Sequence, residues 1–63
     1  MRQLLIDNKF SLNEYEEGKF WEKRTGRYSC LQASEELDTF FICEDGKVYS
    51  VTAVQFKDII SLK

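Results

Sequence analysis

Two runs rich in hydrophobic residues lie in the second half of the chain, on either side of an Asp-Gly pair. Residues 39–44 and 47–52 are rich in β-branched and aromatic side chains, and Asp45-Gly46 separates them. This arrangement predicts a β-hairpin, because a type I′ turn needs a positive φ at both central residues. Apolar residues fall on both faces of the hairpin, so we expect it to lie in the middle of a sheet. The predicted cross-strand pairs are Phe40–Val51, Ile42–Tyr49 and Glu44–Lys47.

A second hairpin is predicted around Thr25-Gly26, between strands at Lys19–Lys23 and Arg27–Ala33. Threonine is β-branched and disfavours a positive φ. We therefore expect a type I turn over Arg24-Thr25, followed by Gly26 as a left-handed bulge residue.

The two cysteines fall on strands that the loop at 34–38 would join. If those strands pair antiparallel around the loop, Cys30 and Cys43 come close to facing each other. The pair lacks the Cys-x-x-Cys spacing of redox motifs, and two cysteines are too few for a disulfide framework. We expect neighbouring structural thiols without a bridge.

The C-terminal residues 52–63 predict a short helix. Thr52 and Gln55 have the spacing of a capping box, and the apolar residues that follow recur at helical intervals. Two β-branched isoleucines weaken this pattern. A final strand over Asp58–Leu62 is the alternative.

The N-terminal part of the chain gives two further predictions. Arg2–Ile6 predicts a strand that ends in a turn at Asp7-Asn8. Ser11 and Glu14 have capping-box spacing and predict one or two helical turns that end at Gly18.

Together these elements predict a single small domain over residues 1–63. Its fold class is α+β and mainly antiparallel β, with a sheet of four or five strands, hairpins at Thr25-Gly26 and Asp45-Gly46, and a short C-terminal helix.

The charge is distributed unevenly along this predicted sheet. The chain has 9 Lys and Arg, 11 Asp and Glu, and a net charge of −2. Residues 19–28 hold four basic side chains against Glu22 alone, a local charge of +3, so the remainder of the chain carries −5. The acidic excess argues against general attraction to nucleic acid or anionic membranes. It is also too small to favour a mimic of the nucleic-acid backbone.

The composition excludes several kinds of site. The chain has no histidine and two cysteines, so it lacks the residues for a His-dependent nucleophile or a Cys₄ zinc site. The three glycines are too far apart for a phosphate-binding loop, and no paired carboxylates sit in a predicted cleft. We therefore expect no enzymatic activity, no metal and no cofactor.

The basic segment also holds three aromatic residues and is the candidate contact surface. Tryptophan, tyrosine and arginine are over-represented among the residues that dominate binding energy at protein interfaces. Aromatic and basic residues together also hold single-stranded nucleic acid. The ordinary alternative is an aromatic core with solvated charges beside a turn. The outer face of the 39–52 hairpin is a second candidate surface. The candidate partner-binding residues are Trp21, Lys23, Arg24, Arg27 and Tyr28.

These observations favour a small protein-binding module, of the adaptor or inhibitor type, that docks on a larger protein. The first alternative is a single-stranded nucleic-acid binder using the 19–28 hairpin, and the second is a homo-oligomer that sequesters a ligand. The apolar surface exceeds what one small core needs, so we also expect association, for which a homodimer is one form. Residues 1–10 have only a short apolar run. We therefore expect no signal peptide or membrane span and a cytoplasmic protein, of a size common among viral and mobile-element genes.

Overall fold

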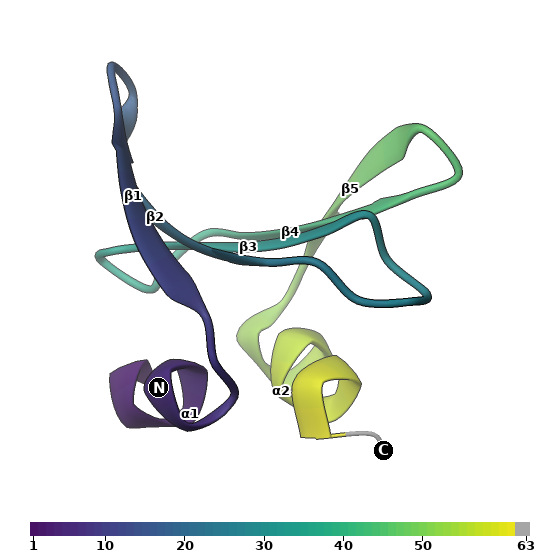
Figure 1. Cartoon of the computed structure of the whole chain (residues 1–63), viewed down its shortest axis with the longest axis horizontal. Helices are drawn as coiled ribbons and strands as arrows, with labels where there is room; N and C mark the ends of the chain where they lie inside the picture. The colour runs from purple at the N-terminus through teal and green to yellow at the C-terminus, as the bar shows by residue number, and fades with distance from the viewer. Residues whose placement is uncertain (62–63) are drawn as a thin grey trace.

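The computed structural model describes residues 1–61 and has a five-stranded antiparallel sheet with a short helix at each end of the chain (Figure 1). The strands lie in chain order, so each pairs with the next through a short connection. The predicted α+β class, mainly antiparallel, is confirmed. The elements are α1 (Arg2–Asp7), β1 (Ser11–Tyr15), β2 (Gly18–Lys23), β3 (Cys30–Ser34), β4 (Phe40–Glu44), β5 (Lys47–Val51) and α2 (Ala53–Ser61).

Both helices cover the same face of the sheet and leave the other face open (Figure 1). Phe56 of α2 is fully buried, with ring centroids 5.1 Å from Phe40 of β4 and 5.9 Å from Phe10. Side chains alternate between faces along a strand, so the covered face collects one set of residues and the open face the other. The buried hydrophobic residues are Leu5, Phe10, Trp21, Leu31, Ala33, Phe40 and Phe56.

The β4–β5 hairpin has the predicted register and turn. The three predicted pairs are present, and φ is 54° at Asp45 and 76° at Gly46. Its expected place in the middle of the sheet is wrong, because β5 is an edge strand. Two of its apolar side chains, Val48 and Tyr49, consequently stay exposed.

The second hairpin exists but its turn differs from the prediction. Residues 24–29 form a wide loop, and Gly26 has no positive φ. The Thr25 hydroxyl accepts hydrogen bonds from the backbone N–H groups of Arg27 and Tyr28, at 3.2 and 2.9 Å. This side-chain turn replaces the tight backbone turn. It also delays the start of β3 to Cys30.

The predicted cysteine pairing is confirmed. Cys30 of β3 and Cys43 of β4 are direct cross-strand partners on the open face, and both are free thiols. The register is fixed on the covered face, where Leu31 pairs with Ile42 and a slip of one residue would expose the core.

The C-terminal helix is confirmed together with its capping box. The N–H of Gln55 donates to Thr52 Oγ1 at 3.1 Å, and Gln55 Oε1 accepts from the N–H of Thr52 at 2.9 Å. The alternative strand over Asp58–Leu62 is wrong for residues 58–61, which are helical. Leu62 lies outside the described residues.

The two N-terminal predictions are wrong, since the predicted strand is a helix and the predicted helix is a strand. A helix over Arg2–Asp7 buries Leu5 completely, and the Asn8 side chain donates to the backbone carbonyl of Leu4 at 2.8 Å. Residues 11–15 instead pair with all but the last residue of β2, and this ladder outweighs the weak local preference of an isolated capping box.

Candidate functional site

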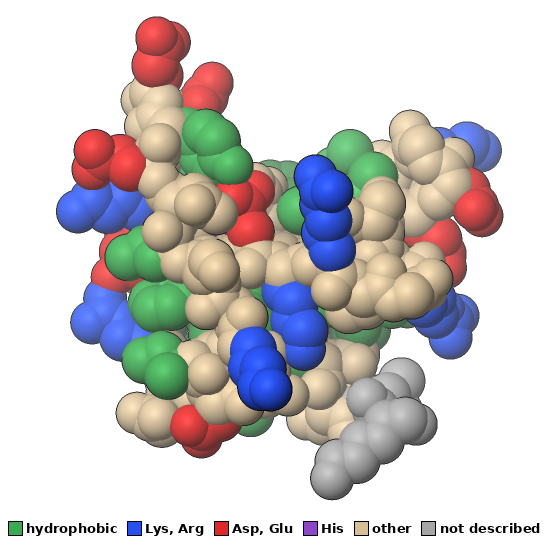
Figure 2. All heavy atoms as spheres, viewed as in Figure 1, with side chains coloured by type: hydrophobic (Ala, Val, Ile, Leu, Met, Phe, Trp, Pro, Cys, Tyr) green, Lys and Arg blue, Asp and Glu red, His purple; other side chains and the backbone are tan. Residues whose placement is uncertain are grey.

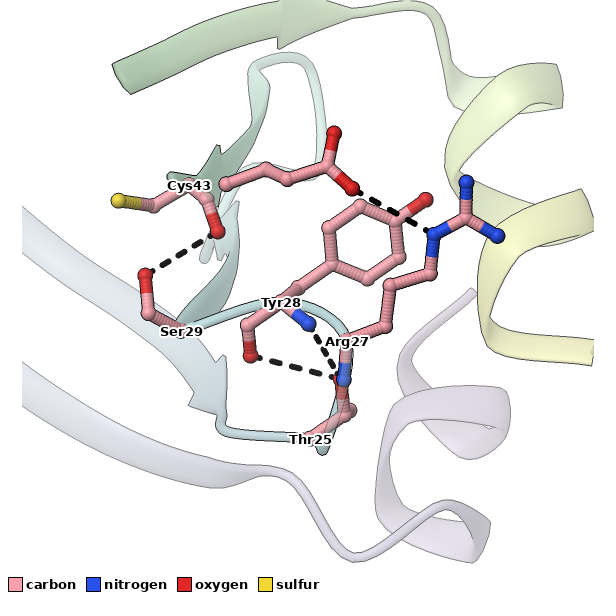
Figure 3. A network of polar contacts seen from close by, with 6 residues as sticks. Thr25, Arg27, Tyr28, Ser29 and Cys43 are labelled. Atoms are coloured by element: carbon pink, nitrogen blue, oxygen red, sulfur yellow. Dashed lines mark hydrogen bonds and ion pairs between the residues drawn. The ribbon is translucent and has the colours of Figure 1, made fainter. Parts of the chain in front are cut away.

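The loop between β2 and β3 is held in shape by its own polar groups (Figure 3). The N–H of Thr25 donates to the carbonyl of Tyr28 at 3.0 Å. Ser29 then ties the loop to β4, because both its N–H and its hydroxyl donate to the carbonyl of Cys43, at 2.9 and 3.1 Å. The loop therefore presents Arg27 and Tyr28 in a fixed place beside α2.

A pocket of about 410 Å³ lies between this loop, the start of β1 and the end of α2. Phe10 and Leu31 are core residues that reach its floor, and half-buried Ile59 and Ile60 of α2 form an apolar wall. Its lining residues are Phe10, Lys23, Thr25, Arg27, Tyr28, Leu31, Ile59 and Ile60.

Two cations border this apolar pocket. The Nζ of Lys23 is 5.9 Å from the centroid of the Phe10 ring, and the Arg27 guanidinium is 5.4 Å from the centroid of Tyr28. Arg27 also forms an ion pair with Glu44 at 3.4 Å, but its side chain is 72% exposed. Its remaining donors are therefore available to a second carboxylate. The arrangement suits an apolar group with a carboxylate beside it.

The predicted site residues fall into three environments. Lys23, Arg27 and Tyr28 come together at the pocket. Arg24 lines a second hollow of about 570 Å³, together with Lys9 and also with Lys23, which borders both. Trp21 is only 8% exposed, and its indole N–H donates to Glu35 at 2.6 Å, so it lies in the core and not on an outer surface.

The basic side chains of residues 19–28 lie at opposite ends of β2. Lys19 lies at one end of β2, where it pairs with Glu14 at 3.8 Å. Figure 2 shows acidic side chains gathered at the projecting tip of the β1–β2 hairpin, which is the end of β2 at which Lys19 lies. Folding thus leaves Lys23, Arg24 and Arg27 as the basic cluster, at the loop end of β2.

Sequence reasoning did not identify the apolar half of the pocket. Ile59 and Ile60 belong to a helical apolar stripe that the sequence predicts as surplus surface for association, and nothing in that pattern places them beside Arg27. Phe10 was hidden by the incorrect helix predicted over 11–18. The surplus of apolar residues in the sequence indicated that some apolar surface stays accessible, but only the fold shows that this surface lies at the pocket.

The open face carries a polar cluster around Glu22. Its carboxylate accepts hydrogen bonds from Tyr15, Asn13 and Gln32 at 2.5, 2.8 and 2.7 Å. Partial burial by itself raises the pKa of Glu22, but these hydrogen bonds and the Arg24 charge outweigh it and hold the pKa below its ordinary value. The hydrogen bond to Glu22 is the main cause that raises the pKa of Tyr15.

The pKa of the neighbouring Cys30 thiol is raised, whereas that of Glu22 is lowered. Burial first, then the negative charge of Glu22, raises the pKa of Cys30. At neutral pH Cys30 is therefore a thiol and not a thiolate.

Two further observations concern residues 1–61. No three of their His, Cys, Asp or Glu side chains are grouped so that they could hold a metal ion. None of the helices within this part of the chain combines the length and apolar character needed to cross a membrane.

Comparison with protein-family models, curated proteins and solved structures finds no match to this chain.

Proposed function

We propose that this chain is a non-enzymatic protein-binding module of the adaptor or inhibitor type. It docks on a larger protein, and an apolar side chain of that partner enters the pocket formed by Phe10, Tyr28, Ile59 and Ile60. The observation that carries the proposal is the meeting of Lys23, Arg27 and Tyr28 around an apolar pocket.

The pocket chemistry specifies the kind of segment that fits. Its volume of about 410 Å³ accommodates one large side chain such as Leu, Met or Phe with part of its backbone. Exclusion of water from Ile59 and Ile60 supplies affinity, and a carboxylate one or two residues away would pair with Arg27 or Lys23. The partner segment is therefore apolar and acidic.

The nucleic-acid alternative has less support from the geometry. Base stacking along a strand needs aromatic rings on one accessible surface. The three aromatic residues of the basic segment are instead separated: Phe20 lies on the open face, Trp21 in the core and Tyr28 at the pocket.

The same proposal places the chain in the cytoplasm, because two facing free thiols are typical of a reducing compartment. The virus-type or mobile-element origin expected for a chain of this size remains part of the proposal.

A random-peptide display library tests the partner chemistry without knowledge of the partner. The immobilised wild-type chain should enrich peptides in which Leu, Ile, Met or Phe lies within two residues of Asp or Glu. A K23A/R27A variant should lose at least about tenfold in affinity for these peptides, because it keeps the apolar pocket and removes both cations. A K19A/K57A variant removes the same charge outside the pocket and should bind as the wild type does.

Four results would count against the proposal. Enriched peptides without a carboxylate, or equal binding by K23A/R27A, would remove Lys23 and Arg27 from the interface and with them the acidic partner segment. A single-stranded oligonucleotide bound more tightly than any peptide, with affinity falling steeply as salt rises, would favour the nucleic-acid alternative. Binding of decanoate in the pocket with no peptide enriched would favour the ligand-sequestering alternative.

A further inference from the structure

Strand β5 is an unprotected sheet edge. Val48 is 69% exposed and Tyr49 44% exposed, one on each face of the strand, and Val54 at the start of α2 adds another side chain at 69%. The strand contains no proline, and its pairing with β4 is regular, without a bulge. Lys47 at its beginning is its single charged residue.

The backbone of β5 is available for pairing. Bonded and non-bonded pairs alternate along an antiparallel ladder, so every second residue of an edge strand turns its N–H and C=O away from its neighbour. Nothing in residues 1–61 pairs with that side of β5, since the sheet ends there. An edge of this kind tends to pair with another strand unless charges, proline or a bulge prevent it.

The other edge of the sheet has such protection. Strand β1 carries Glu14 and leads directly into Glu16 and Glu17, all exposed. A contact between two copies places each charge near its own counterpart, so an acidic edge opposes self-association. Residues 48–56 carry no charged side chain. Charge therefore selects β5, and not β1, as the edge that can meet an identical chain.

We propose that β5 pairs antiparallel with β5 of a second copy, across a two-fold axis at Tyr49, and joins two sheets into one. This register pairs the whole strand: Tyr49 lies opposite Tyr49 of the second copy, Val48 opposite Ser50, and Lys47 opposite Val51. Each pair matches residues of the same face, so the helices of both copies lie on one side. No residue of β5 lines the pocket, and the dimer leaves the partner site free.

The test uses opposite charges at the axis. Light scattering of the wild-type chain should give twice its 7.5 kDa mass at near-millimolar concentration. Y49K and Y49E should each shift to monomers, with at least about tenfold weaker association, because like charges then face each other. An equimolar mixture of the two variants should recover the doubled mass. L12K is the matched control, since Leu12 has the same 44% exposure and lies on the same face of the other edge.

A measurement on the unchanged chain covers the case in which a variant fails to fold. Hydrogen exchange at the outward-facing amides of β5 should slow as concentration rises, while exchange in β1 stays constant. A wild-type monomer at near-millimolar concentration would overturn the proposal, and so would a dimer that survives both charge variants. Failure of the mixture to recover the dimer would overturn the proposed register, because the side chains at position 49 of the two copies would then not face each other.

Discussion

The two faces of the sheet are stabilised by different forces. The covered face is apolar: Leu5, Leu31 and Phe56 are fully buried there. The open face carries a carboxylate on β2, Glu22, that accepts hydrogen bonds from three neighbouring side chains. Residues one apart on the same strand, Trp21 and Glu22, therefore have opposite surroundings.

The difference follows from the size of the chain. Two short helices cover one face, and no further element of residues 1–61 covers the other. The covered face therefore supplies most of the hydrophobic stabilisation. The open face depends on polar contacts that respond to pH, and its aromatic residues stay partly exposed.

The largest predicted effect compares a phenylalanine on each face. Phe56→Ala should lower the free energy of unfolding by about 3–5 kcal/mol, because it leaves a cavity between α2 and β4. Phe41→Ala on the open face should cost about 1 kcal/mol, since that side chain is already partly exposed to water. Urea unfolding followed by circular dichroism measures both. Equal losses would contradict the division of the faces.

Some elements of the fold could be predicted from the sequence, and others could not. The β4–β5 turn and the capping box at Thr52 each depend on local chemistry that a short window contains, and the pairing of Cys30 with Cys43 follows from the short loop at 34–38. The N-terminal elements do not depend on such local chemistry, because Arg2–Asp7 and Ser11–Tyr15 are decided by which partner each segment packs against. Ser11 has the same spacing to Glu14 as Thr52 has to Gln55, yet only the second pair caps a helix.

The candidate site likewise has residues that could be predicted from the sequence and residues that could not. Lys23, Arg27 and Tyr28 were predicted from residue type alone, and they do lie together. Trp21 could not be separated from them, because alternation places it on the opposite face from Phe20 without saying which face is buried. The position of β5 at an edge was equally hidden, since apolar residues on both faces of a strand look the same whether a neighbour is present or not.

A smaller effect tests the polar cluster of the open face. Glu22→Gln should lower the free energy of unfolding at pH 7 by about 0.5–1 kcal/mol, because the carboxylate accepts hydrogen bonds that an amide accepts less well. The pKa of Glu22 is lower in the folded chain than the ordinary value of 4.5, so its stabilisation is present above that pH and is lost as the pH falls through the folded pKa. Unfolding free energies of wild type and variant should therefore converge between neutral and acid pH. A constant difference would show that the charge of Glu22 is not responsible.

The smallest effect concerns the thiol beside Glu22. Because burial and Glu22 raise the pKa of Cys30, removing the Glu22 charge should increase the thiolate fraction at pH 8. In a Cys43→Ser background, where Cys30 is the remaining thiol, Glu22→Gln should speed alkylation by iodoacetamide roughly twofold. The reagent is neutral, so its rate reports the thiolate and not attraction to the surface. The difference should vanish at high pH, where both variants are fully ionised. Glu36→Gln, which removes the same charge from an exposed loop, should leave the rate unchanged, and an equal increase there would mean that overall charge, not the open-face cluster, controls the thiol.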